Sequence, residues 1–244
     1  MGLKIKIRFL YKISILAHTD YKGIAASFTV VPKQLMQQKE RQEMNMAMDF
    51  KQSETMKNLM RAFAGESQAR NRYTFAAGQA HQQGLYVLEQ VFQFTADQEK
   101  EHAEVFYNQL KELAGETIEI DGTYPVDLSP NMSELLKMAQ HNEYEEHDDV
   151  YKNFGDKAQE EGFGKAGMKF HKIAEIEKMH GDRFGAFAKL LEDNQLFVSK
   201  VETKWMCLNC GYVYEGTEAP MSCPVCDHEQ GWYVRLELAP YCRS

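Results

Sequence analysis

The stretch Glu175-Ile176-Glu177-Lys178-Met179-His180 lies in a segment whose apolar residues predict a helix from about Lys165 to Leu191. The buried face of this helix is marked, at the i, i+3, i+4 spacing, by Phe170, Ile173, Ala174, Phe184, Ala188 and Leu191. Continued through the middle of the segment, the same face carries Glu177 and His180. A buried charge is costly unless it is paired or bound to a metal. This Glu-x-x-His pair is therefore a candidate metal-binding motif, although one pair alone leaves a structural role open.

A second Glu-x-x-His pair occurs in a predicted helix from Leu88 to Leu113. The buried face of that helix is marked by Leu88, Val91, Phe92, Thr95, Phe106, Leu110 and Leu113. Glu99 and His102 fall on this face. Two such pairs on two amphipathic helices are typical of carboxylate-bridged di-metal four-helix bundles, in which the other two helices each add a glutamate.

Two further predicted helices supply candidate glutamates. A helix from about Lys51 to Gln82 carries Glu66 on its apolar face, where a role at the edge of the core is the alternative. A helix from about Asn131 to Glu161 carries Glu143 and Glu146 on its inner side. Neighbouring acids leave open that this helix presents a solvated acidic face; they are Glu145, Asp148 and Asp149.

The helix boundaries predict how the helices are connected. Capping-box spacing marks the starts of the first and third helices, at Asp49 with Gln52 and at Asn131 with Glu134. Gly115 is placed to end the second helix. Residues 116–130 then form a long crossover, which favours a ferritin-like topology over a simple up-and-down bundle.

The C-terminal region contains two Cys-x-x-Cys pairs, Cys207 with Cys210 and Cys223 with Cys226, separated by twelve residues. This spacing predicts a tetrahedral four-thiolate metal site rather than disulfides. A unit of this size buries little core, so a metal supplies stability. Thiolate count alone leaves structural zinc and iron both open. The fifth cysteine, Cys242, is expected to be a free thiol.

Charge separates the N-terminal region from the rest of the chain. The chain has a net charge of −8, which argues against a nucleic-acid partner, and it has no apolar run long enough to span a membrane. The first 39 residues carry seven Lys or Arg and one Asp, a net +6, which leaves −14 for the remainder. Residues 3–15 alternate apolar and basic as a strand does. A targeting tail, an added element of the fold and a misassigned start are the alternatives, and we favour the last.

Taken together, these motifs resemble the rubrerythrin family, in which a ferritin-like di-iron bundle is fused to a C-terminal rubredoxin-like domain. The resemblance covers about residues 48–240 and rests on segments 62–73, 97–102, 143–146 and 177–180 and on the cysteine segment 207–226 followed by His228. It implies a mainly α fold with residues 1–47 as an extension, 48–195 as the bundle, 196–204 as a linker and 205–244 as the rubredoxin-like domain.

The resemblance also implies the site residues. Two irons would be bound by Glu66, Glu99, His102, Glu143, Glu146, Glu177 and His180, with Glu99 and Glu177 bridging. A third, redox-active iron would be bound by Cys207, Cys210, Cys223 and Cys226, which makes three irons per chain and no haem. Glu146 and His102 would exchange on one iron as its oxidation state changes. Tyr73 and Tyr151 match family tyrosines near the site.

The activity implied is cytoplasmic reduction of hydrogen peroxide to water, which protects against oxidative stress. Electrons would come from rubredoxin or an NAD(P)H-dependent reductase, and the chain would form a homodimer or higher oligomer. Two alternatives remain. One is a ferroxidase with iron-storage function, which shares the bundle but does not need the cysteine domain. The other is a non-catalytic protein whose cysteines hold zinc and dock a partner.

Overall fold

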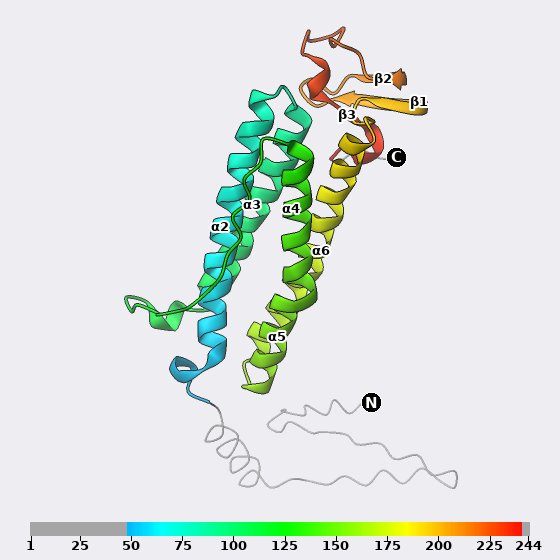
Figure 1. The fold of residues 1–244 in the computed structure, drawn as a ribbon. Helices are drawn as coiled ribbons and strands as arrows, with labels where there is room; N and C mark the ends of the chain where they lie inside the picture. Colours follow the sequence, from blue (N-terminus) through cyan, green and yellow to red (C-terminus); the bar gives the residue numbers. More distant parts are fainter. Residues whose placement is uncertain (1–47, 241–244) are drawn as a thin grey trace, which may run out of the picture. The chain divides into compact units, whose positions relative to one another are not determined.

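The computed structural model describes residues 48–240. The main helices are α2 (Glu54–Gln82), α3 (Tyr86–Asn108), α4 (Met132–Glu145), α5 (Tyr151–Glu160) and α6 (Gly164–Glu192), and a small sheet follows them (Figure 1). No helix in this range is long and apolar enough to cross a membrane. The predictions for residues 1–47 and for Cys242 as a free thiol lie outside the described residues.

The helices form two antiparallel hairpins joined by a long crossover, as the ferritin-like prediction requires. Helix α2 packs against α3, and α4 and α5 pack against α6. The crossover runs back along α2, so that α3 and α4 point in the same direction (Figure 1). Two side chains of α2 hold it: Arg61 Nε donates to the Asp121 carbonyl at 3.0 Å and Gln79 Nε2 to the Ser129 carbonyl at 2.8 Å.

Two predicted helix boundaries differ from the structure. Ser53, not Asp49, caps α2, because its Oγ accepts from the Met56 amide at 3.1 Å. Asp49 instead caps a short 3₁₀ turn, η1 (Phe50–Gln52). Helix α3 ends at Asn108 and a second 3₁₀ turn, η2 (Lys111–Leu113), follows it. Gly115 then adopts a φ of 87°, the left-handed conformation that glycine tolerates best.

The predicted continuous third helix is wrong in its middle. A π-helix, η3 (Glu146–Val150), separates α4 from α5. In an unbroken α-helix, Glu143 and Tyr151 would point about 80° apart, whereas absorbing one residue in a π turn brings them to within about 20°. Both side chains are buried, each about 1 % exposed. The π-helix therefore allows the consecutive segments α4, η3 and α5 to direct both side chains into the interior of the bundle.

Two apolar clusters fill the bundle on either side of a polar layer. The cluster nearer the cysteine domain includes Tyr73, Phe92 and Phe184, and the other includes Leu59, Phe106 and Phe170. Along α2, α3 and α6 the candidate ligands fall between these clusters in sequence. The polar layer is thus bounded at both ends by close-packed side chains.

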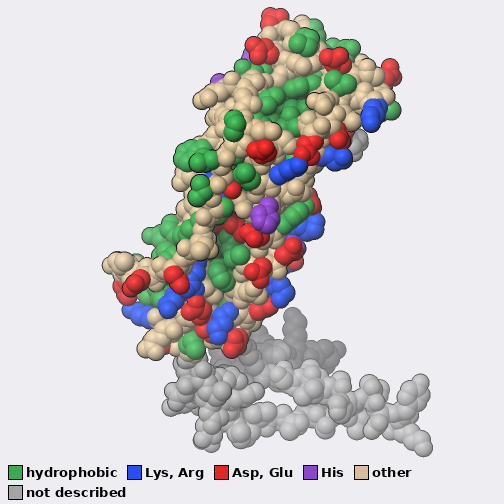
Figure 2. Space-filling view, viewed as in Figure 1, with side chains coloured by type: hydrophobic (Ala, Val, Ile, Leu, Met, Phe, Trp, Pro, Cys, Tyr) green, Lys and Arg blue, Asp and Glu red, His purple; other side chains and the backbone are tan. Residues whose placement is uncertain are grey.

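The outer faces of the helices carry charges of both signs. On the face shown in Figure 2, acidic and basic side chains are interspersed along the bundle. Several pair one helical turn apart, as Lys152 and Asp156 do at 2.9 Å. On this face the pattern is that of a solvated surface, not the single-sign surface that binds nucleic acid.

The C-terminal unit is a three-stranded antiparallel sheet in the order β2-β1-β3. Its strands are β1 (Val198–Cys207), β2 (Val213–Glu218) and β3 (Tyr233–Arg235). The expected linker at 196–204 is therefore largely part of β1. Trp205, on β1, is buried and donates from Nε1 to the Gly216 carbonyl at 2.9 Å.

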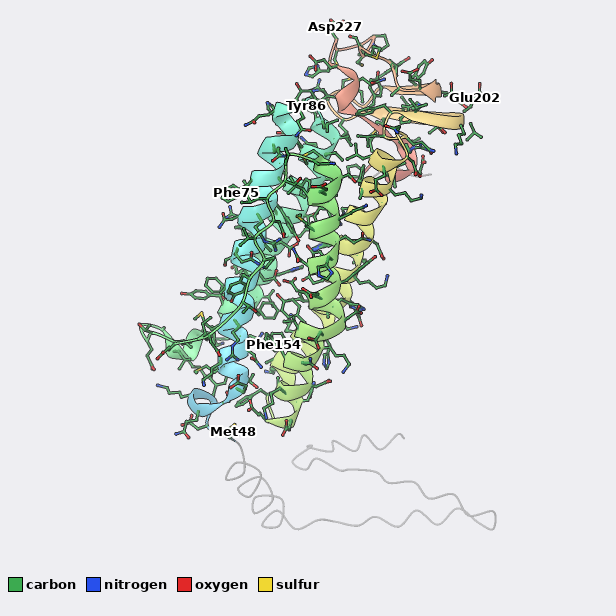
Figure 3. The ribbon with its side chains drawn as sticks, in the orientation of Figure 1. Met48, Phe75, Tyr86, Phe154, Glu202 and Asp227 are labelled. Atoms are coloured by element: carbon green, nitrogen blue, oxygen red, sulfur yellow. The ribbon has the colours of Figure 1, made fainter. Side chains whose placement is uncertain are left out.

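The sheet unit packs closely on the end of the α2–α3 hairpin. Trp232 stacks on Tyr86, the first residue of α3, which is labelled in Figure 3. The ring centroids are 4.9 Å apart. A Cβ on Gly231 would lie 1.8 Å from the Gly84 carbonyl oxygen, so only glycine fits there. Val234 and Leu196 also join the bundle core. The connection between the bundle and the cysteine unit is therefore a packed interface.

Candidate metal centres

Six of the seven candidate ligands in the bundle lie together at its centre. They form two groups of four: Glu66, Glu99, His102 and Glu177, and Glu99, Glu143, Glu177 and His180. All four helical segments of the bundle contribute, with α4, η3 and α5 counted as one segment. Helix α2 carries Glu66, α3 carries Glu99 and His102, α4 carries Glu143, and α6 carries Glu177 and His180. Each of the six is buried.

The two groups share Glu99 and Glu177, and each of these carboxylates spans both. Glu177 Oε1 is 3.0 Å from His102 Nδ1, while its Oε2 is 2.9 Å from His180 Nδ1. Glu99 Oε2 is 3.2 Å from His102 Nδ1, while its Oε1 is 2.9 Å from His180 Nδ1. The imidazoles stack with centroids 5.5 Å apart. One oxygen of each carboxylate thus faces each histidine, which is the arrangement of a bridging ligand.

Each group has one further glutamate. Glu66 Oε1 lies 3.9 Å from His102 Nδ1, and Glu143 Oε2 lies 3.5 Å from His180 Nδ1. Among the described residues, several of these buried atoms make no hydrogen bond despite their close neighbours; they are Glu66 Oε2, Glu99 Oε1, Glu143 Oε2, both oxygens of Glu177 and His180 Nδ1. Such groups are costly to bury unless a cation satisfies them. The donor set therefore fits a pair of metal ions.

Burial and mutual repulsion strongly perturb the acids and imidazoles of this cluster. Burial raises the pKa of Glu66 well above its usual range, and the charges of Glu177 and Glu99 add to this rise. Burial, reinforced by the charge of Glu99, raises the pKa of Glu143 to about 8. Burial alone would lower the pKa of His180, but the surrounding carboxylates raise it to about 12. Bound cations would displace these protons and remove the repulsion.

Both predicted tyrosines lie against the cluster. The Tyr151 hydroxyl donates to Glu66 Oε1 at 2.6 Å, and the Tyr73 hydroxyl donates to Glu143 Oε1. The rings of both are packed in the apolar clusters on opposite sides of the polar layer. Each terminal glutamate is therefore oriented by a phenol from a neighbouring helix, and each phenol holds a proton at the edge of the site.

Sequence reasoning missed a positioning network around His180. His180 Nε2 lies 3.1 Å from Gln98 Oε1, so its N–H donates there and Nδ1 faces the carboxylates. Arg183 donates to the same Gln98 oxygen at 3.1 Å and to Thr95 Oγ1 at 2.8 Å. Metal-ligating histidines ordinarily donate their second nitrogen to such a partner. Periodicity could not have identified Gln98, because its half-buried position is compatible with an ordinary surface amide.

Glu146 is the seventh candidate, and it is in neither group of four. It is half-buried at the start of the π-helix and lines a cavity of about 560 Å³ with Tyr151. Burial raises its pKa well above the usual range, with the charges of Glu143, Glu177 and Glu99 adding to the effect. The negative charges of the cluster therefore disfavour ionisation of Glu146, although its side chain lies on the cavity side. Glu145, in contrast, is exposed.

The four cysteines of the C-terminal unit also come together. Their sulfurs lie within 4.8 Å of one another, with Cys207 3.7 Å from Cys226 and Cys210 3.6 Å from Cys223. A tetrahedron of sulfurs about 2.3 Å from a central metal has edges of about 3.8 Å. None of the four is in a disulfide. The spacing fits a metal ion bound by four thiolates.

Each Cys-x-x-Cys pair forms a similar turn around the sulfurs. The Gly211 amide donates to the Cys207 carbonyl at 2.8 Å, and the Asp227 amide donates to the Cys223 carbonyl at 2.9 Å. Gly211 and Asp227 have φ values of 79° and 60°. The backbone amide of His228 lowers the pKa of Cys226 to about 6, against a smaller opposing effect of burial. Amides directed at the sulfurs stabilise thiolate ligands.

A four-helix bundle with this carboxylate and histidine cluster, joined to a four-thiolate unit, defines a ferritin-like di-metal protein with a rubredoxin-like domain. Family models agree: the Rubrerythrin model matches residues 57–188, and the model of the rubrerythrin rubredoxin-like domain matches residues 205–233. Rubrerythrin of Clostridium perfringens is 42 % identical over 185 residues, which cover 75 % of this chain and 95 % of that protein.

Solved structures share the fold of this chain in whole or in part. Partially reduced nigerythrin matches with a TM-score of 0.51 and 28 % identity, covering 78 % of this chain and 92 % of that one. Mycobacterium tuberculosis bacterioferritin, at 18 % identity and a TM-score of 0.50, covers 57 % of this chain and 86 % of its own and shares the fold. The chain belongs to the rubrerythrin family of oxidoreductases, and its two clusters fit iron.

Proposed function

We propose that this chain is a peroxidase that reduces hydrogen peroxide to water at a di-iron centre and is re-reduced through an iron held by four cysteines. The observation that supports this most directly is the bridging arrangement of Glu99 and Glu177. Each has one carboxylate oxygen toward His102 and the other toward His180. Carboxylates and imidazoles are suited to iron that cycles between ferrous and ferric states.

The ligand assignment follows the two groups. Glu66 and His102 would hold one iron, Glu143 and His180 would hold the other, and Glu99 and Glu177 would bridge them. Glu146 would add a carboxylate when the iron is oxidised, since an anion favours the higher charge. Cys207, Cys210, Cys223 and Cys226 would hold a third iron, which makes three per chain without haem.

When bound, two ferrous ions supply both electrons that peroxide reduction needs, so that H₂O₂, two protons and two electrons give two water molecules. Residues of the chain position protons and orient ligands around this site. Tyr151 and Tyr73 hold hydroxyl protons against Glu66 and Glu143 at the edge of the cluster. The apolar clusters pack the bundle on both sides of the polar layer. Gln98 holds His180 with Nδ1 directed inward.

Electrons would reach the cysteine unit one at a time from rubredoxin or from an NAD(P)H-dependent reductase. The chain would work as a homodimer or higher oligomer. We place it in the cytoplasm, where cysteines such as these four, which form no disulfide, are kept reduced. The four-thiolate unit favours a reductase over an iron-storage shell, because a storage shell has no need of an electron-accepting unit.

The proposed function is tested by metal analysis and coupled turnover of the natively expressed protein. We expect about three irons per chain and NADH consumption that requires hydrogen peroxide, rubredoxin and its reductase together. Mineral-core formation without peroxide-dependent NADH consumption would favour the ferroxidase. Zinc in the cysteine unit with no iron in the bundle would favour a non-catalytic docking protein.

A further inference from the structure

A cavity of about 560 Å³ opens beside the carboxylate cluster. It lies between α2, the crossover and the segment formed by η3 and α5. Its lining includes Glu146 and Tyr151, and Tyr151 donates to Glu66 Oε1 at 2.6 Å. The cavity thus ends one hydrogen bond away from the group of four that contains His102. Phe154, another lining residue, marks the α5 side in Figure 3.

The charges around the cavity favour neutral molecules. Glu145, Glu146 and Asp149 line it, and the guanidinium of Arg61, also in the lining, is already paired with Glu54 and Asp121. A cavity with this excess of acids repels anions. Its apolar surface comes from the crossover, η3 and α5, which contribute the side chains of Tyr124, Val150 and Phe154 respectively.

The cavity is much larger than hydrogen peroxide requires. A water molecule occupies about 30 Å³, and hydrogen peroxide has two oxygen atoms instead of one. Pockets of about 300 to 1,000 Å³ ordinarily hold organic ligands. The volume of about 560 Å³, with both polar and apolar lining, falls within that range.

We propose that this cavity is the access route for neutral hydroperoxides, ROOH, and that it admits organic hydroperoxides as well as hydrogen peroxide. This inference rests on the proposed peroxidase function. The O–O bond of ROOH would break with uptake of two protons and of two electrons from the ferrous pair, so that an alcohol and one water molecule leave. The organic group would lie against Tyr124, Val150 and Phe154, with the O–O group toward Glu146 and Tyr151.

Gly65 is the position from which the route can be closed. A Cβ at Gly65 would lie 3.7 Å from Tyr124 Cε1 and 4.0 Å from Tyr151 Oη, so a methyl group fits in ordinary contact. A longer side chain would fill the space between the two rings. Gly78, on the same helix, is a matched control because, beyond its own helical turn, no atom of the described residues lies within 4 Å of a Cβ built there. Replacing either glycine raises helix propensity similarly.

The test compares wild type, Gly65→Ala, Gly65→Leu and Gly78→Leu with tert-butyl hydroperoxide as the probe. Saturation-transfer NMR on zinc-loaded protein, which cannot reduce the probe, reports binding through the tert-butyl methyl signal. We expect transfer in wild type and in Gly78→Leu and its loss in Gly65→Leu. In stopped-flow oxidation of the reduced iron forms, the rate with tert-butyl hydroperoxide should fall about tenfold or more in Gly65→Leu, and the rate with hydrogen peroxide should fall less.

The outcomes distinguish failure of the access route from failure of the peroxidase function. Equal rates and equal methyl transfer in Gly65→Leu and Gly78→Leu would overturn the access route, as would absence of transfer in wild type. If Gly65→Leu fails to load metal, Gly65→Ala carries the comparison, with an expected rate loss of about twofold or more for the organic hydroperoxide against wild type. If methyl transfer follows Gly65 but neither peroxide oxidises the wild-type iron form, the cavity binds the organic molecule and the peroxidase function is wrong.

Discussion

At the scale of residues, the site depends on charged side chains placed on apolar helical stripes. The stripe that carries Glu177 and His180 and the stripe that carries Glu99 and His102 are readable from periodicity, because a charge there interrupts an otherwise apolar face. Periodicity cannot show which nitrogen of His180 faces the carboxylates. That is set by Gln98, whose oxygen lies 3.1 Å from His180 Nε2.

Gln98→Leu should weaken metal binding at the His180 side by about tenfold to a hundredfold. The substitution removes the acceptor of the His180 N–H and leaves the imidazole free to reorient. Competition between metal-free protein and a chromophoric zinc chelator measures the two affinities. Gln93→Leu makes the same change on the same helix at an exposed position that pairs with Asp97, so an equal loss in that variant would contradict the role of Gln98.

Glu146→Ala should retain two irons in the reduced state but react with peroxide about tenfold more slowly. The di-iron reduction potential should rise, because the ferric state loses an anion that favours it. Anaerobic iron analysis, stopped-flow absorption and redox titration together report these effects. Glu145→Ala, at the exposed neighbouring position, should change neither the rate of reaction with peroxide nor the reduction potential. Equal effects of the two substitutions would mean that Glu146 does not act on the metals.

At the scale of elements, the crossover and the π-helix shape the open side of the site. Their locations were predictable only in part: the long connection at 116–130 indicated ferritin-like topology, but no pattern indicated that η3 would replace an α-helical turn. A π turn adds one residue without a change in composition, so helical periodicity still fits on both sides of it. The position of Tyr151 against Glu66 follows from this turn.

The crossover is fastened by Asp127, which pairs with Arg72 on α2 and accepts from Asn142 Nδ2 on α4 at 2.7 Å. The Arg72 and Asp127 side chains are only 13 % and 14 % exposed. Asp127→Ala leaves a largely buried guanidinium unpaired and should lower stability by about 2–3 kcal/mol, or about 5–10 °C in melting temperature. Calorimetry of the zinc-loaded protein measures this shift.

Asp121→Ala is the control for the crossover. Asp121 also pairs with an arginine of α2, but its side chain is 91 % exposed. Its loss should therefore change the melting temperature much less than the loss of Asp127, since exposed ion pairs contribute little. Equal shifts would show that the crossover is not held through the buried pair.

At the scale of the whole molecule, the chain joins a buried di-metal site to a four-thiolate unit. The fold class and both metal clusters were predictable because their signals are repeated: two Glu-x-x-His pairs and two Cys-x-x-Cys pairs. The packed interface was not predictable, since β1 begins where a linker was expected. The interface depends on tertiary details, namely the Tyr86–Trp232 stack and the close approach of Gly231 to Gly84.

Cys210→Ser should abolish repeated turnover, whereas the pre-reduced di-iron site should still be oxidised once by peroxide. Loss of one thiolate removes the four-sulfur iron or its redox behaviour, whereas the ligands in the bundle remain. Coupled NADH consumption should fall at least about tenfold, while pre-reduced protein should still be oxidised once by peroxide. Wild-type rates in the coupled assay would show that electrons reach the bundle by another route.

Reduced iron in the bundle is expected to react with peroxide, and anaerobic stopped-flow mixing of the fully reduced protein tests this most directly. One sample is mixed with one equivalent of hydrogen peroxide per di-iron site, and a second is mixed with air-saturated buffer. We expect the peroxide sample to form the diferric spectrum completely, and faster than the sample in air. Oxidation in air that is faster than oxidation by peroxide, or no oxidation by peroxide, would contradict the peroxidase function.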